Sequence, residues 1–145
     1  MKTLLFAVMC GLVLFGGTAS AEKAMYLPIG VVIDGDTIST VYRRLPTQLG
    51  KISIRIIGID SPEAGTRAKC EKERLQGLQA KAALVKLTAP YKRMVATNCK
   101  YDKFGGRWNC DVKVGNIDIR QHMLDSGLVV PYYGATKPNW CEIIK

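Results

Sequence analysis

The sequence predicts a mainly β fold with a few helices, an α+β domain, on three observations. In several short segments apolar residues alternate with polar ones, as they do in strands that bury one face. One longer segment changes to spacings of three and four residues, which is typical of an amphipathic helix. Dipeptides such as Asp-Gly and Ser-Pro separate the segments and indicate turns. A chain of 145 residues with this pattern is expected to form one hydrophobic core.

Residues 1–21 have the features of a secretory signal peptide. Lys2 gives a positive start, residues 4–15 are apolar, and Ala19-Ser20-Ala21 offers a cleavage site with small side chains. The apolar run is too short to span a bilayer, so we expect no stable membrane association. The mature protein would be a single domain over residues 22–145, periplasmic or secreted.

The domain should begin with a β-hairpin. Residues 26–33 are apolar and have high β-propensity, Asp34-Gly35 is a favoured turn dipeptide, and residues 37–42 alternate in character. A turn-like segment follows at residues 45–50. The hairpin would therefore continue into a further strand.

That third strand is expected over residues 51–59, because Ile52, Ile54 and Ile56 recur with a period of two and would share one face. Pro62 lies beyond the strand and has no amide hydrogen to donate to a neighbour. The three strands fit a meander.

An amphipathic helix is expected over residues 69–87, with Pro90 just beyond its end. Its apolar face consists of residues spaced by three and four positions: Leu75, Leu78, Ala82 and Val85. Two more strands are expected after the helix, at residues 92–98 and 107–114, around a loop at 100–106.

The last part of the chain should hold one short helix over residues 118–126. It is expected to begin at Asn116 or Asp118 and to end at Gly127. Residues 128–145 are expected to be irregular. Five strands with a helix between the third and the fourth is the order of an OB-type barrel, so we expect an OB-fold five-stranded barrel with two or three flanking helices.

Four cysteines remain once Cys10 leaves with the signal peptide: Cys70, Cys99, Cys110 and Cys141. An even number in an exported chain indicates two disulfides. A zinc site is the competing interpretation, but the chain has no Cys-x-x-Cys motif and only one histidine. Of the three possible pairings we favour Cys99 with Cys110, which flank one expected hairpin, and Cys70 with Cys141, which would fix the C-terminal segment. Spacing alone leaves the other two open.

Two clusters of charged residues are candidates for chemistry. Asp34 and Asp36 lie at the hairpin turn, where an Asp-Gly pair is also common for structural reasons alone. Arg55 and the segment Asp60-Ser61-Pro62-Glu63 lie on and after the next strand. Neighbouring strands of a meander would bring both clusters to one end of a barrel.

These residue types fit metal-assisted hydrolysis of a phosphodiester. Aspartates from two strands, a backbone carbonyl and waters suit calcium, a hard cation that prefers oxygen ligands. Glu63, three positions after a ligand, is placed to activate water. Arginine is planar, bidentate and always charged, so Arg55 and Arg107 are candidates to stabilise the charge on phosphate. Taken singly, Arg55 and Glu63 fit equally well as ordinary surface residues.

Five stretches follow one another through nearly all of the expected mature chain: 32–38 (Val-Ile-Asp-Gly-Asp-Thr-Ile), 55–63 (Arg-Ile-Ile-Gly-Ile-Asp-Ser-Pro-Glu), 70–73 (Cys-Glu-Lys-Glu), 102–107 (Asp-Lys-Phe-Gly-Gly-Arg) and 119–127 (Ile-Arg-Gln-His-Met-Leu-Asp-Ser-Gly). In this order they resemble the staphylococcal nuclease (thermonuclease) family. The Trp140-Cys141 ending is similar to that of exported members.

The resemblance implies an OB-fold and a calcium-dependent endonuclease that cleaves DNA and RNA with little sequence specificity and leaves 3′-phosphate ends. Calcium would be bound by Asp36, Asp60 and the backbone carbonyl of Ser61, with Asp34 behind them. Glu63 would be the general base, and Arg55 and Arg107 would hold the scissile phosphate. The other substrate contacts that it implies are Lys103 and Phe104 on a terminal phosphate and Tyr132 or Tyr133 stacked on a base.

The chain departs from the family pattern in the arginine loop and at its C-terminus. Gly105-Gly106 adds one residue before Arg107, and Phe104 stands where a tyrosine is expected. Ser61 replaces a threonine, which is harmless if the ligand is the backbone carbonyl. A disulfide from Cys70 to Cys141 would compensate for the missing terminal helix.

Two other classes of function compete with the nuclease. One is a non-catalytic OB-fold nucleic-acid-binding protein that has lost hydrolysis, which the complete set of carboxylates and arginines disfavours. The other is a secreted inhibitor or adhesin in which the motifs are coincidental. The formal net charge of +9 favours a polyanionic partner such as DNA or RNA. We expect the protein to be a monomer.

Overall fold

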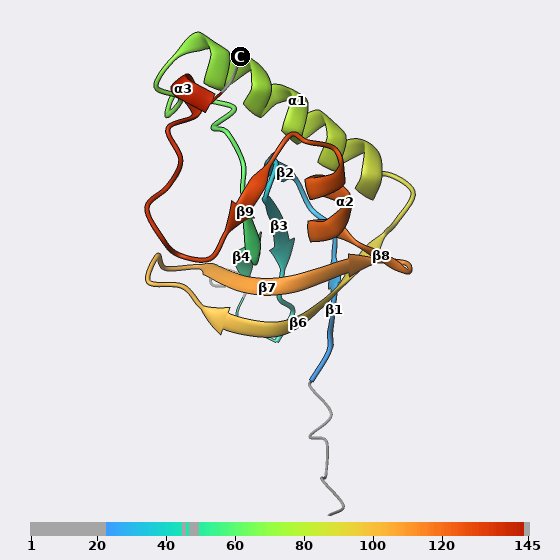
Figure 1. Ribbon diagram of the computed structural model, residues 1–145. Coiled ribbons are helices and arrows are strands. Elements are labelled where there is room, and N and C mark those ends of the chain that lie inside the picture. The colour runs from blue at the N-terminus through green and yellow to red at the C-terminus, as the bar shows by residue number, and fades with distance from the viewer. Residues whose placement is uncertain (1–22, 45, 47–49, 144–145) are drawn as a thin grey trace, which may run out of the picture.

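The computed structural model describes residues 23–44, 46 and 50–143 of the chain. The expected signal peptide and part of the expected turn at 45–50 lie outside these residues. The described part is a mixed α+β structure with a seven-stranded sheet, a two-stranded sheet and three helices (Figure 1). The predicted α+β class is therefore confirmed. Within the described residues, no helix has the length and apolar character needed to cross a membrane.

The large sheet is antiparallel except for one parallel pair, β4 with β7. Its lateral order is β1-β6-β7-β4-β3-β2, and β8 extends it beside β7. In chain order its strands are β1 (Met25–Pro28), β2 (Val32–Asp34), β3 (Thr37–Val41), β4 (Lys51–Ile56), β6 (Arg93–Tyr101), β7 (Arg107–Val114) and β8 (Ile117–Asp118). The expected meander is present as β2, β3 and β4.

The two edges of this sheet are consecutive in the chain. The connection between β1 and β2 is bonded to β3, because the Gly30 amide donates to the Ser39 carbonyl at 2.9 Å and the Ser39 amide donates to the Val31 carbonyl at 2.8 Å. The expected five-stranded barrel is not confirmed, because the described large sheet has seven strands in an open order. The expected first strand, 26–33, is interrupted and counts as two, and the short β8 adds another.

Helix α1 (Glu71–Thr88) lies across one side of the molecule, opposite the β6–β7 hairpin (Figure 1). The helix is confirmed, but the predicted apolar face is wrong: Leu75, Leu78, Ala82 and Val85 are exposed. The buried residues are Glu73, Gly77, Ala80, Leu84 and Thr88.

Close packing of the backbone explains this reversal. A Cβ atom on Gly77 would lie 2.5 Å from the Glu63 carbonyl carbon, and one on Gly35 would lie 2.6 Å from the Ala80 Cβ. Small residues therefore let α1 approach the loops that carry the acidic clusters, whereas Leu75, Leu78 and Val85 face outward.

The chain leaves the large sheet after β4 and forms a second, smaller one. Strand β5 (Gly58–Asp60) pairs with β9 (Val130–Tyr132), so the expected strand at 51–59 is broken at Ile57. Helix α2 (Ile119–Asp125) matches the prediction, with Asp118 as its N-cap. Helix α3 (Trp140–Ile143) follows β9. The expectation that 128–145 is irregular is therefore wrong, because a strand and a short helix form where β5 and α1 offer partners.

The hydrophobic core lies between the large sheet and the helices. The predicted face of β4 is buried, with Ile52, Ile54 and Ile56 exposing 5%, 0% and 1% of their surface. Leu84 of α1 and Met123 of α2 pack in the same cluster. This core fixes the strand ends that carry the acidic residues.

Both favoured disulfides are present in the structure. Cys70 at the start of α1 is bonded to Cys141 in α3, and Cys99 of β6 is bonded to Cys110 of β7. The ligand atoms of Cys70, Glu73 and Cys141 lie within 4.8 Å of one another. Since both sulfurs belong to a disulfide, this group has no thiolate to offer a metal.

Candidate active site

Two buried carboxylates meet at one arginine. Asp36 lies directly before β3 and Asp60 at the end of β5, and each exposes 1% of its surface. Arg55 of β4 donates from Nη1 to Asp36 Oδ1 at 2.8 Å and from Nη2 to Asp60 Oδ1 at 3.1 Å. The β3–β4 register makes this contact possible, because it places Arg55 opposite Thr37. The structure thus brings three of the predicted site residues together.

Asp36 makes three further hydrogen bonds, two through its carboxylate and one through its backbone amide. The Thr37 hydroxyl donates to its Oδ1 at 2.7 Å, and the Ser61 amide donates to its Oδ2 at 3.0 Å. Asp34 Oδ1 accepts from the Asp36 amide at 3.2 Å. Ser61 and Asp34 therefore lie where the sequence placed them, beside the first predicted ligand.

The pKa of Asp36 is raised from 3.8 to about 7, mainly by burial and also by the charge of Asp34, against the opposing effect of Arg55. Burial also works against the charge of Arg55, but Asp36 and Asp60 raise its pKa above the usual value. The guanidinium of Arg55 therefore stays charged. Even beside this positive charge, the ionised form of Asp36 is less favourable in the fold than it is in water.

Asp60 has two partners that sequence reasoning missed. Lys137 Nζ lies 2.8 Å from its Oδ1, and Trp140 Nε1 donates to its Oδ2 at 3.1 Å. Both residues lie in the segment expected to be irregular. The neighbouring Cys141 could have indicated the position of Trp140, because the favoured disulfide to Cys70 holds α3 against the start of α1.

Glu63 lies in the loop after β5, with 27% of its side chain exposed. Its Oε2 accepts from Arg67 Nε at 3.1 Å. Glu63 shares a cavity of about 240 Å³ with Asp34, lined also by Ile33, Ala64, Gly65, Thr66 and Arg67. The predicted base is therefore beside the acidic cluster, without a direct hydrogen bond to Asp36 or Asp60 among the described residues.

A buried glutamate on α1, Glu73, positions the Glu63 loop. Its Oε2 accepts from the Lys69 amide at 2.7 Å and its Oε1 accepts from the Glu63 amide at 3.5 Å. Cys70 acts as the N-cap, because its sulfur accepts from the Glu73 amide. The sequence carried a signal for this role, since an acidic residue three positions after the N-cap is the pattern of a capping box.

Arg107 lies apart from the carboxylates. It is the first residue of β7 and pairs with Ser53 of β4. Arg55 lies two positions after Ser53 on β4, so Arg107 and Arg55 are on the same face of the sheet. Its Nε lies 2.7 Å from Asp102 Oδ2, and its guanidinium carbon lies 4.6 Å from the centre of the Phe104 ring. Among the described residues no ion pair joins it to Asp36 or Asp60.

The remaining predicted contacts fall in two places. Lys103 lies with Arg107 at the Phe104 ring, its Nζ being 5.3 Å from the ring centre. Tyr132 is on β9, opposite Gly58 of the strand that ends at Asp60, and its hydroxyl donates to the Ala135 carbonyl. Tyr133 follows it and is 78% exposed. The tyrosines are therefore close in the fold to the Asp60 strand, and Lys103 and Phe104 belong to the arginine loop.

Replacing Asp36 by asparagine should stabilise the metal-free protein at pH 8. The folded state binds a proton on Asp36 more tightly than the unfolded chain does, so the free energy of unfolding of the wild type should fall as pH rises from about 4 to about 7. A shift of this size corresponds to at most ~4 kcal/mol. Asparagine carries no charge, and the variant should lose this pH dependence. Urea unfolding with a chelator at pH 5 and pH 8 measures both effects.

The exposed Asp125→Asn variant is the matched control and should change the free energy of unfolding by less than about 0.5 kcal/mol at both pH values. If Asp36→Asn were less stable than the wild type at pH 8, the charged form of Asp36 would be favourable in the fold, contrary to this prediction.

Comparison of the chain with protein-family models and with curated proteins gives no match.

Proposed function

We propose that this protein is a calcium-dependent endonuclease that hydrolyses DNA and RNA with little sequence specificity and leaves 3′-phosphate ends. The observation that carries the proposal is the meeting of buried Asp36 and Asp60 at Arg55, with Glu63 in the adjoining loop. We further propose that it works as a monomer outside the cytoplasm, where its two disulfides would be stable.

We also propose that the fold is a variant of the OB barrel. Support comes from β1 and β2, which lie at opposite edges of the sheet although only three residues separate them. The Thr40 hydroxyl donates to the Pro28 carbonyl at 2.6 Å, so β1 lies against β3 as well as β6. The order of the other strands, including the parallel β4–β7 pair, agrees with a sheet that curls back on itself.

The donor set suits calcium. Asp36 and Asp60 offer carboxylate oxygens, and the Ser61 backbone is held beside Asp36 by its own amide. The unfavourable charge of Asp36 next to Asp34 would be relieved by a cation. Calcium bound there would neutralise phosphate charge and polarise the phosphorus–oxygen bonds. Once calcium shares the carboxylates of Asp36 and Asp60, Arg55 can turn toward the phosphate.

Glu63 would take the proton from the attacking water. Its partner Arg67 is 71% exposed, so their ion pair is weak and can open when substrate is present. Arg107 would stabilise the phosphate charge from the β6–β7 loop, exchanging Asp102 for the substrate. Hydrogen bonds from the two arginines would strengthen as charge develops in the transition state.

Removal of calcium should abolish hydrolysis by residues 22–145. Fluorogenic single-stranded DNA and RNA are incubated with the protein in added calcium and again in excess chelator, and fragment ends are identified by mass. We expect cleavage with calcium, 3′-phosphate ends, and no cleavage with chelator. Cleavage that persists in chelator would contradict the metal requirement, and binding without cleavage in calcium would favour the non-catalytic OB-fold module.

A further inference from the structure

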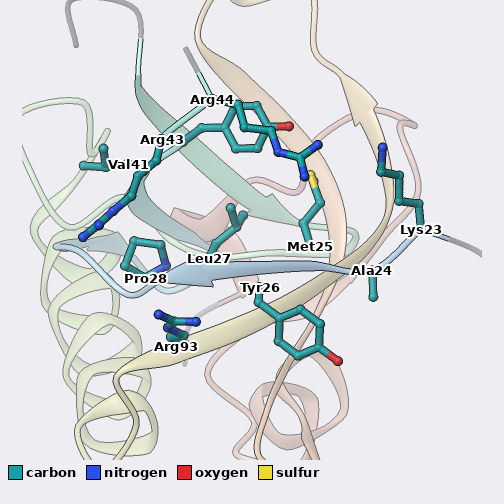
Figure 2. A pocket seen from close by; sticks show the side chains of 11 residues that line it. Lys23, Ala24, Met25, Tyr26, Leu27, Pro28, Val41, Arg43, Arg44 and Arg93 are labelled. Atoms are coloured by element: carbon teal, nitrogen blue, oxygen red, sulfur yellow. The ribbon is translucent and has the colours of Figure 1, made fainter. Parts of the chain in front are cut away.

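A second, strongly basic feature lies away from the carboxylates. A cavity of about 430 Å³ opens between β1 and the end of β3 (Figure 2). Four of the residues that line it are cationic, Lys23, Arg43, Arg44 and Arg93, and none is acidic. Within the described residues these four side chains form no ion pair. Their charge is therefore available to a ligand.

The four cations are distributed along β1. Figure 2 shows Lys23 and Arg44 near the Met25 end of the strand and Arg43 and Arg93 near Pro28. Strand β1 has four residues, so its two ends are about 10 Å apart. Two pairs of cations at this separation suit a ligand with several phosphates in a row better than a single small anion.

An exposed aromatic ring lies on the same side of β1 as Arg93 (Figure 2). Tyr26 of β1 is 68% exposed. The β1–β6 register pairs Pro28 with Arg93 and Tyr26 with Val95, so the Tyr26 ring and the Arg93 side chain lie on the same face of the sheet. Positive charge beside an exposed aromatic ring is the combination that binds the backbone and bases of single-stranded nucleic acid.

Strand β3 connects this cavity with the candidate active site. Its first residue, Thr37, lies opposite Arg55, and its last, Val41, lines the cavity. The four steps between them cover about 13 Å. The cavity and the candidate active site therefore lie at opposite ends of the same strand.

We propose that this basic cavity is a second binding site, which holds the phosphates of single-stranded nucleic acid several nucleotides from the bond that is cleaved. The proposal extends the proposed nuclease function and rests on it for the role of the site, although binding itself needs neither calcium nor the carboxylates. The site would retain a long strand between successive cleavages and would contribute little to the binding of very short substrates.

The double variant Arg43→Gln/Arg93→Gln should bind DNA more weakly than the wild type. Binding of a fluorescein-labelled 20-nucleotide oligothymidylate is followed by fluorescence anisotropy in excess chelator over a range of salt concentrations. We expect roughly tenfold weaker binding and a salt slope smaller by about 1.4, which is two phosphate contacts at about 0.7 each. The control Lys72→Gln/Lys86→Gln removes the same charge from exposed positions on α1 and should change affinity by less than about threefold.

Equal weakening by both double variants would overturn the proposal, because net charge would then account for the effect. A second variant, Lys23→Gln/Arg44→Gln, removes the cations at the other end of β1 and gives the same test if the first fails to fold. Cleavage of a dinucleotide in calcium separates the two proposals: the cavity variants should retain the wild-type rate. If no protein cleaves but the cavity variants alone bind weakly, the proposed function fails and the binding site stands.

Discussion

Replacing Glu63 by glutamine should lower kcat for DNA hydrolysis by about 10²- to 10⁴-fold, the range that a positioned general base contributes. Glutamine has the same size and can still accept a hydrogen bond from Arg67, but it cannot take a proton from water. Because the side chain is only partly buried, the free energy of unfolding should change by less than about 0.5 kcal/mol. Initial rates at saturating DNA and calcium measure kcat, and urea unfolding checks the stability.

Glu71→Gln is the matched control for this experiment. Glu71 is an exposed glutamate at the start of α1 that pairs with Arg74, and its replacement should leave kcat unchanged. Oligonucleotide binding in chelator should be the same for the wild type and both variants. If Glu63→Gln kept the wild-type kcat, another group would have to activate the water.

Removing the Cys70–Cys141 disulfide should cost both stability and activity. The bond joins residues 71 positions apart, so the double alanine variant should lose about 4 kcal/mol of unfolding free energy through the greater freedom of the unfolded chain. The bond also fixes α3, which holds the Trp140 indole on Asp60. The rate of hydrolysis should therefore fall further than the loss of folded protein explains. Urea unfolding and nuclease rates at a temperature where the variant is folded separate the two effects.

The second disulfide provides the comparison. Cys99 and Cys110 are only 11 positions apart, and their double alanine variant should lose about 3 kcal/mol. Its residual activity should follow the folded fraction, because this bond joins β6 to β7 and does not hold α3. Equal loss of activity per folded molecule in both variants would contradict a special role for α3.

Local patterns predicted the parts of the fold that local physics determines. The period of two placed Ile52, Ile54 and Ile56 on the buried face, and the predicted limits of the strand at 107–114 are those of β7. Asp118, one of the two expected caps of α2, is the N-cap, as the hydrogen-bonding preference of aspartate at a helix start allows. In each case neighbouring residues alone carry the information.

The predictions that failed concerned contacts between distant segments. The predicted buried face of α1 was wrong because the spacing of apolar residues cannot show that Gly35 and the Glu63 loop pack against the helix. Strand β9 was not predicted because it pairs with β5, a strand that forms only where the chain leaves the large sheet at Ile57. The site residues Asp36, Arg55 and Asp60 were found by motif, but their joint contact depends on the β3–β4 register, and Trp140 reaches Asp60 only through the tertiary fold.

The position of the two carboxylates in different sheets bears on which ion the proposed site would select. Asp36 precedes β3 of the large sheet, whereas Asp60 ends β5 of the small sheet, and Arg55 and the Ser61 amide join them. The separation of their oxygens is therefore set by how the two sheets pack, and we expect it to tolerate small changes. An adjustable cage suits calcium, which tolerates variable coordination numbers and distances. Magnesium, which requires a strict and smaller octahedron, would be discriminated against by the same freedom.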